Sequence, residues 1–161
     1  MAESAQDRTD QAETMTHTVH TMQESDTNVR YLRGLAKLKE IDGHVGERVV
    51  ESLADIAPDF ARYLVEFPFG DIYSRPGLDL KSREIATIAA LAALGNARPQ
   101  LEVHIAAALN VGCSRAEIVE VAMQMAVYAG FPAALNALFA AKTVFQRCDT
   151  ASNGSPCQRR P

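Results

Sequence analysis

The feature that most constrains the fold is a series of helix start and stop signals over residues 77–144. Asp79 is a candidate N-cap for a helix that extends to Leu94, and Gly95 lies just beyond its end. Apolar residues recur through the region with helical spacing, and no alternating run is long enough to predict a strand. The sequence therefore predicts an all-α domain.

Three further helices come next, which we predict over residues 99–110, 114–130 and 132–146. A proline at the start of the first and the last suits an opening helical turn, where its missing N–H costs nothing. The second begins with Ser114 and Glu117, which have the form of a capping box. In such a box each side chain satisfies a free backbone N–H of the other residue.

Upstream of residue 77 we predict three shorter helices followed by a loop. Apolar spacing predicts the helices over residues 29–40, 45–56 and 58–67. Asp42 and Gly43 predict a turn between the first two. Pro and Gly are frequent over residues 68–77, which predicts a loop that forms one wall of a functional site. This loop holds the large side chains of Phe69, Asp71, Tyr73 and Arg75.

The two ends of the chain have too few apolar residues to repay the cost of ordering the backbone. Residues 1–28 carry six acidic side chains against one basic side chain, which accounts for most of the net charge of −4. We predict a disordered acidic tail over residues 1–28, one domain over residues 29–147, and a flexible C-terminal tail over residues 148–161.

We expect neither a secretory signal nor a membrane span in this sequence. Its start lacks a basic segment followed by an apolar run, and no stretch approaches about eighteen consecutive apolar residues. The domain is nearly neutral and has no basic stripe that would bind nucleic acid or an anionic membrane. We expect a cytoplasmic protein with no nucleic-acid or membrane partner.

The last two predicted helices are apolar almost all round, as the run VAMQMAVYAGFPAALNALFAA shows. A small monomer shields one stripe of each helix, so the remaining apolar surface would face water. Burial against another subunit removes this exposure, and a central position within the chain's own bundle is the alternative. We expect a homo-oligomer.

Two ionisable side chains, Glu84 and His104, lie within otherwise apolar helical patterns. His104 falls on the face formed by Leu101, Ile105 and Ala108. Alone, such a histidine is more often a core residue with one hydrogen bond than a functional group. An acid early in a helix, as Glu84 is, usually just complements the helix dipole. Periodicity alone therefore favours structural roles for both.

Motifs for cofactors and activated nucleophiles are missing from the sequence. The three cysteines include no C-x-x-C pair. His17 and His20 lie in the N-terminal tail, and His44 and His104 have no local partner at metal-ligand spacing. There is no phosphate-binding glycine loop, no dinucleotide fingerprint and no G-x-S-x-G elbow. We expect no metal, nucleotide, flavin or other cofactor.

Four blocks of sequence, taken in order, resemble the gamma-carboxymuconolactone decarboxylase family, which is related in fold to alkylhydroperoxidase D. The blocks are RPGLD, K-x-R-E, L-x-x-H-x-x-x-A-L-N and Q-x-A-V-Y-x-G-x-P-A-A, and the similarity covers residues 34–144. The resemblance implies a bundle of about six to seven helices. It also implies assembly as a trimer or hexamer, with a site between helices and near subunit contacts.

Glu84 matches the family glutamate of the K-x-R-E block, and His104 matches the family histidine. The peroxidase branch carries a C-x-x-C just before the histidine, whereas this chain reads NARPQLEVH. The resemblance therefore implies acid–base chemistry without a redox pair. The implied reaction is decarboxylation of a small carboxylated lactone, 4-carboxymuconolactone or a related compound, in aromatic-compound catabolism.

That reaction needs no cofactor, because the substrate's own carbonyl accepts the negative charge that forms when CO2 leaves. His104 is the expected proton donor, and Glu84 is expected to orient it and tune its pKa. Arg75 is the expected carboxylate clamp, since a guanidinium suits bidentate recognition. Asp71 and Tyr128 are expected in the wall of the site.

Two departures from the family pattern widen the choice of substrate. Ala106 stands where an arginine is expected, and Phe69 and Tyr73 replace tryptophans. A related lactone or a β-keto acid is therefore an alternative substrate. Two other functions stay open: a thiol-dependent peroxidase relative that uses Cys113 or a tail cysteine, and a non-catalytic oligomeric binding protein.

Overall fold

The computed structural model describes residues 28–151, and every regular element in that range is a helix. This confirms the predicted all-α class. The predicted N-terminal tail and most of the predicted C-terminal tail lie outside the described residues. Helical residues 28–42 are followed by α2 (His44–Glu51), α3 (Pro58–Leu64), η1 (Val65–Tyr73), α4 (Leu80–Leu94), α5 (Arg98–Asn110), α6 (Arg115–Tyr128) and α7 (Phe131–Ala151).

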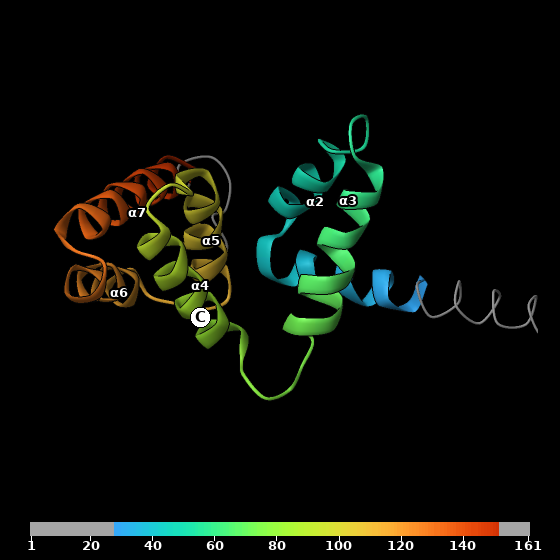
Figure 1. Ribbon diagram of the computed structural model, residues 1–161, viewed down its shortest axis with the longest axis horizontal. Coiled ribbons are helices and arrows are strands. Elements are labelled where there is room, and N and C mark those ends of the chain that lie inside the picture. Colours follow the sequence, from blue (N-terminus) through green and yellow to red (C-terminus); the bar gives the residue numbers. More distant parts are fainter. Residues whose placement is uncertain (1–27, 152–161) are drawn as a thin grey trace, which may run out of the picture.

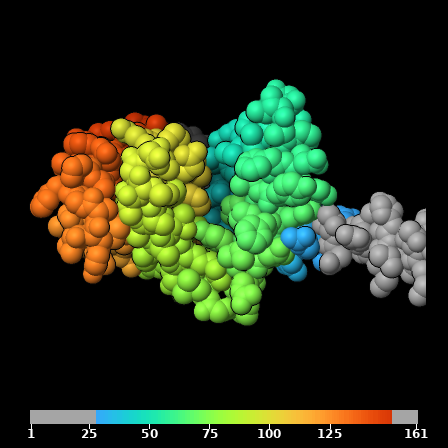
Figure 2. Space-filling view, in the orientation of Figure 1, coloured from blue at the N-terminus to red at the C-terminus, as the bar shows by residue number. Residues whose placement is uncertain are grey.

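These helices form two lobes joined by residues 74–79 (Figure 1). The N-terminal lobe contains residues 28–73, and the C-terminal lobe contains α4–α7, residues 80–151. The lobes touch, with α4 and α5 beside the N-terminal lobe (Figure 2). Ala107 of α5 is buried in the core of the N-terminal lobe, and Asn110 Nδ2 donates a hydrogen bond of 3.2 Å to the Ile41 carbonyl oxygen. The boundary between the lobes is therefore packed and hydrogen-bonded.

Local end signals define the helices of the C-terminal lobe. Asp79 caps α4 by accepting a hydrogen bond of 2.8 Å from the Ser82 backbone N–H, and Gly95 ends the helix at φ 74°. Ser114 and Glu117 form both hydrogen bonds of a capping box at the start of α6. The predicted starts of α4 and α6 are thus confirmed, because caps satisfy backbone groups that the helix itself leaves unpaired.

The core of the C-terminal lobe combines a few branched side chains with many alanines. The larger buried members are Ile88, Leu101, Ile105, Ile118, Met125 and Val144. The small ones are Ala92, Ala108, Ala122, Ala137, Ala140 and Ala141. Because an alanine adds little volume at a helix contact, the four helices pack closely around one core.

The N-terminal lobe depends on a close approach of two backbones. A Cβ atom added at Gly34 would clash with the Val65 carbonyl oxygen, and one added at Gly70 would lie 2.7 Å from the Arg30 carbonyl oxygen. Only glycine at both positions lets the helix over residues 28–42 lie this near η1. The core that results is small and contains Leu38, Ile41, Val65 and Phe69.

The loop predicted over residues 68–77 is wrong for its first six residues. Residues up to Tyr73 belong to η1, a π-helix with Pro68 inside it. Proline has no N–H, so it cannot make the regular i→i−4 hydrogen bond, and a π-turn absorbs that loss without ending the helix. Gly70 lies in this helix for its contact with Gly34 rather than for a turn. The non-helical connection between the lobes is therefore limited to residues 74–79.

Three other helix ends differ from the predictions. The first helix runs to Asp42, and the turn begins at Gly43 with φ 57°. α2 ends at Glu51 instead of residue 56, and turns follow it. α7 continues to Ala151, and Cys148 is buried in the core of the C-terminal lobe. The folded region therefore extends past the predicted boundary at residue 147. None of the helices between residues 28 and 151 has the length and apolar character needed to span a membrane.

Candidate functional site

Glu84 of α4 and His104 of α5 meet beside the boundary between the lobes. His104 Nδ1 donates a hydrogen bond of 2.9 Å to Glu84 Oε2. The Glu84 side chain is 0% exposed, whereas the His104 side chain keeps 22% of its surface exposed. A buried carboxylate therefore fixes one ring nitrogen of an imidazole that is partly exposed to solvent. We refer to these residues as the Glu84–His104 pair.

The positions of both residues follow from the faces of their helices. Glu84 lies one turn before the buried Ile88, so its side chain points into the protein and not along the exposed face of α4. His104 lies between Leu101 and Ile105, both buried in the same core. The apolar pattern that favoured structural roles is thus also the pattern that brings the two side chains together.

Asp42 is a third ionisable residue at this site, and the sequence interpretation missed it by assigning it to a turn. It is the last residue of the first helix and is only 8% exposed. A usable signal was present, because Tyr31, Leu35, Leu38 and Asp42 follow one another at helical spacing. The acid therefore continues the apolar stripe of its helix and is buried with it.

Tyr73 adds a hydroxyl from η1. Its side chain makes a hydrogen bond of 2.8 Å with the Thr87 hydroxyl of α4, which itself donates to the Arg83 carbonyl oxygen at 3.0 Å. Since Thr87 uses its proton on that carbonyl, Tyr73 is the donor in the bond between the two hydroxyls. The predicted wall residue Tyr73 thus lies near the pair, but on a helix instead of a loop.

Three groups at this site, His104, Asp42 and Tyr73, have shifted pKa values. Burial lowers the pKa of His104, but its hydrogen bond to Glu84 and the charges of Glu84 and Asp42 outweigh this, so the pKa is raised. Burial raises the pKa of Asp42 to about 6, opposed by the His104 charge and assisted by the Glu84 charge. Burial also raises the pKa of Tyr73 to about 12, against the effect of its Thr87 hydrogen bond. The groups around His104 therefore stabilise its imidazolium form relative to an isolated histidine.

Two carboxylate oxygens at this site are buried without a hydrogen-bond partner: Glu84 Oε1 and Asp42 Oδ1. A buried, unsatisfied oxygen costs free energy, and such groups concentrate at functional sites. Within residues 28–151, no group of three His, Cys, Asp or Glu side chains is arranged as metal ligands.

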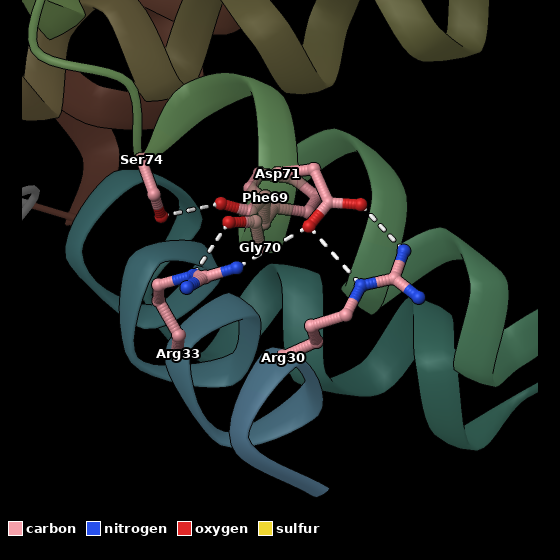
Figure 3. Close-up of polar contacts among 6 residues, drawn as sticks. All are labelled: Arg30, Arg33, Phe69, Gly70, Asp71 and Ser74. Atoms are coloured by element: carbon pink, nitrogen blue, oxygen red, sulfur yellow. Dashed lines mark hydrogen bonds and ion pairs between the residues drawn. The ribbon is translucent and has the colours of Figure 1, made fainter. Parts of the chain in front are cut away.

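The structure does not join the other predicted site residues to the pair. Asp71 is held by Arg30 and Arg33, and Arg33 Nε also donates to the Gly70 carbonyl oxygen at 2.7 Å (Figure 3). Ser74 donates to the Phe69 carbonyl oxygen in the same region. These bonds tie η1 to the first helix, so Asp71 has a structural role in the N-terminal lobe.

Arg75 and Tyr128 are both exposed. Arg75 lies in the connection after η1, where its carbonyl oxygen accepts a hydrogen bond from Arg83. Tyr128 ends α6 and is 76% exposed. In a single chain, neither side chain takes part in the Glu84–His104 pair.

Cys113 has the properties of a core thiol. It is buried in the C-terminal lobe, and burial is the main cause that raises its pKa. A raised pKa disfavours the thiolate that peroxide chemistry requires. Cys148 is buried as well, and Cys157 lies outside the described residues. The described cysteines therefore do not favour the thiol-dependent alternative.

Comparison with known proteins identifies relatives over most of the chain. The model of the carboxymuconolactone decarboxylase family matches residues 58–143. A 4-carboxymuconolactone decarboxylase from Acinetobacter baylyi is 38% identical over 119 residues, which cover 73% of this chain and 87% of the relative. A nitrosuccinic acid decarboxylase from Metarhizium robertsii is 30% identical over 118 residues, covering 70% of this chain and 81% of the relative. An uncharacterized 15.0 kDa protein from Paracoccus denitrificans is 36% identical over 107 residues, covering 66% and 78%.

Proposed function

The chain belongs to the carboxymuconolactone decarboxylase family, and from that premise we propose that it is a cofactor-independent carboxy-lyase. Its proposed substrate is a small carboxylated lactone, 4-carboxymuconolactone or a related compound. Two of the relatives are named as decarboxylases of different substrates. Both substrates have a carboxylate near a group that accepts electrons, a conjugated carbonyl in one and a nitro group in the other.

The observation that carries the proposal is the hydrogen bond of 2.9 Å between buried Glu84 and partly exposed His104. Glu84 occupies Nδ1, which leaves Nε2 of the imidazolium as the nitrogen that can give a proton to a substrate. Glu84 and Asp42 raise the pKa of His104 against the effect of burial, which extends the pH range over which the imidazolium can give that proton. The proton donor, His104, and its carboxylate partner, Glu84, are therefore both supplied by this chain.

The proposed reaction proceeds in two steps. The bond between the ring carbon and the carboxylate breaks, CO2 leaves, and the electron pair moves through the alkene onto the lactone carbonyl oxygen. His104 Nε2–H then protonates the resulting dienolate at carbon, and the neutral imidazole regains a proton from water at its exposed edge. Charge is balanced, since one proton enters for each CO2 released.

Substrate anchoring is assigned to Arg75, whose exposed guanidinium suits bidentate binding of a carboxylate. The apolar excess predicted for the last two helices supports a homo-oligomer, a trimer or hexamer. Large side chains on α6 and α7 are exposed in the single chain: Met123, Val127, Tyr128, Phe131, Leu135 and Phe139. Burying this face against another copy removes it from water. We propose Tyr128, 76% exposed in the single chain, as a wall residue of a site near this contact.

The proposal is tested with the purified full-length chain and three substrates: 4-carboxymuconolactone, a β-keto acid and nitrosuccinate. CO2 release is followed for each, together with loss of the lactone absorbance for the first. We expect turnover of at least one substrate by the wild type and none by His104→Gln, with an unchanged oligomer size on gel filtration. Full activity of His104→Gln would remove this residue from the mechanism.

A further inference from the structure

Asp42 of the N-terminal lobe lies at the boundary with α5, because its neighbour Ile41 is buried in the same core as Ala107, one turn after His104. Its helix ends at this residue, and the hydrogen bond from Asn110 Nδ2 to the Ile41 carbonyl oxygen fixes that end against α5, the helix of His104. α2 covers it from the other side, since a Cβ atom added at Gly46 would lie 2.9 Å from Asp42 Cβ. The acid is therefore held in place from two directions and is 8% exposed.

No positive side chain of the described residues neutralises this acid by a salt bridge. Its Oδ1 is buried without a hydrogen-bond partner. The ionisable groups that act on it or are affected by it are Tyr73 on η1, Glu84 on α4 and His104 on α5. The charges of α2 lie on its exposed or half-buried side, where His44 pairs with Glu47. Within residues 28–151, His104 is thus the cation that faces Asp42.

An acid in this position changes the proton affinity of the imidazole without touching the reacting atoms. Once ionised, Asp42 attracts the imidazolium and has no comparable interaction with neutral imidazole. Glu84 already occupies Nδ1, so a second carboxylate adds charge and leaves Nε2 free. The effect works through space across the boundary between the lobes.

We propose that Asp42 is a positioning residue that keeps His104 in its imidazolium form. The proposal rests on the acid–base role of His104 proposed above. It extends that role by giving the first helix a specific function. Through Asp42, this helix keeps the proton donor charged at pH values where an imidazole paired with Glu84 alone would have lost its proton.

The order of titration follows from the geometry. Burial raises the pKa of Asp42 to about 6, so above this pH the acid is ionised and supports the imidazolium. Below it Asp42 is neutral and no longer supports the imidazolium. The contribution of Asp42 therefore matters at neutral and alkaline pH, and it disappears in acid.

The direct test is an NMR titration of the His104 ring in the absence of substrate. The wild type is compared with Asp42→Asn and with Glu66→Gln, and the His104 signal is identified by its loss in His104→Gln. Glu66 is the matched control, because it is a buried acid of the same lobe, 4% exposed, with an unpartnered Oε1. We expect Asp42→Asn to lower the pKa of His104 and Glu66→Gln to leave it unchanged. An unchanged titration in Asp42→Asn would overturn the proposal.

A measurement on the wild type alone covers the case in which Asp42→Asn does not fold. The carboxyl carbon of Asp42 should titrate near pH 6, and the His104 ring should respond to the same step. An Asp42 carboxyl that titrates near its ordinary value of 3.8, with no response at His104, would overturn the proposal.

The pH dependence of turnover then shows whether the coupling is used. In Asp42→Asn we expect the ratio of kcat at pH 8.5 to kcat at pH 6.5 to fall about three- to tenfold relative to wild type, as removal of one nearby charge predicts. Glu66→Gln should keep the wild-type ratio. If the wild type releases no CO2 from any substrate, the proposed function fails while the NMR coupling stands. If the wild type is active and the ratio is unchanged in Asp42→Asn, the present inference fails instead.

Discussion

The two lobes of the molecule are built by different means. In the C-terminal lobe, each helix has its own end signals, and alanines let α4–α7 pack around one core. In the N-terminal lobe, two glycines bring backbones together, a π-helix carries an internal proline, and two arginines bind one aspartate. Local chemistry therefore defines the C-terminal lobe, whereas contacts between distant segments define the N-terminal lobe.

This difference extends to the candidate site. The C-terminal lobe supplies the Glu84–His104 pair, and the N-terminal lobe supplies Asp42 and Tyr73. The proposed proton donor, His104, and its direct partner, Glu84, thus lie on the lobe with the stronger local signals. The groups proposed to tune them come from the lobe whose structure depends on long-range contacts. Four substitutions, taken from the largest expected effect to the smallest, test this division.

The largest expected effect is on kcat, and it should differ between two buried glutamates: Glu84 of the C-terminal lobe and Glu66 of the N-terminal lobe. Glu84→Gln removes the charge that holds the His104 imidazolium, so we expect kcat to fall about 10²-fold or more. Glu66→Gln removes a buried carboxylate of η1 that is not among the groups acting on the pair, and kcat should stay at the wild-type value. Steady-state CO2 release measures both. Equal losses in the two variants would show that the division of roles between the lobes is wrong.

The next effect concerns the stability of the N-terminal lobe. Gly34→Ala places a methyl group against the Val65 carbonyl oxygen and 3.0 Å from the Gly70 backbone nitrogen. Because backbone atoms cannot move aside as a flexible side chain can, we expect the free energy of unfolding to fall by about 1–3 kcal/mol.

Gly77→Ala is the control for Gly34→Ala, since a Cβ atom at Gly77 meets nothing within 4 Å. It should leave the free energy of unfolding unchanged or raise it by about 0.4–1 kcal/mol, because the unfolded chain loses freedom. Urea unfolding followed by circular dichroism compares the two. A Gly34→Ala protein as stable as the wild type would remove the close backbone approach as a determinant of this lobe.

The third expected effect is a pH dependence of the free energy of unfolding that is caused by Asp42. Its folded pKa of about 6 lies above the unfolded value of 3.8, so the folded state binds more protons between these values and wild-type stability falls as pH rises through them. A rise of this size corresponds to about 3 kcal/mol. Asp42→Asn removes the dependence, so its stability relative to the wild type should be greater at pH 8 than at pH 4 by about 2 kcal/mol, the part of the linkage that falls between these pH values.

The measurement is the difference in unfolding free energy between Asp42→Asn and the wild type at both pH values. If this difference in unfolding free energy is the same at both pH values, the pKa of Asp42 is not raised in the folded state. Asp42→Asn could be more stable than the wild type at pH 8 and yet have a lower kcat at alkaline pH. That combination would mean that Asp42 supports the proton donor and destabilises the N-terminal lobe.

The smallest effect should come from a local signal of the C-terminal lobe. Ser114→Ala removes the side-chain acceptor of the capping box at the start of α6, so we expect a loss of about 1 kcal/mol. Ser114→Asp keeps an acceptor and should retain most of the stability. Thermal unfolding measures both variants. If Ser114→Ala lost much more stability than Gly34→Ala, the C-terminal lobe would depend on this one cap more than on the packing of its core.

The same contrast explains which parts of the structure could be predicted from sequence. Asp79 and Ser114 were recognisable as caps because a cap needs only residues three positions away. Pro68 and Gly70 were interpreted as ending a helix, although Gly70 serves a contact with residue 34 that no local pattern reveals. The meeting of Glu84 with His104 required the family resemblance, because helical spacing alone favoured structural roles. Asp42 was missed because a short polar residue before glycine also fits a turn.

The π-helix has a consequence for how the chain tolerates changes of length. Each residue added to or removed from a helix rotates the downstream residues about the helix axis by a sizeable part of a turn. Deleting one residue between Gly70 and Tyr73 would therefore keep the glycine contact and turn the tyrosine away from Thr87, or keep the tyrosine and lose the glycine contact. Insertions and deletions should accordingly be excluded from η1 among functional homologues, while the connection over residues 74–79, with open space at Gly77, admits them.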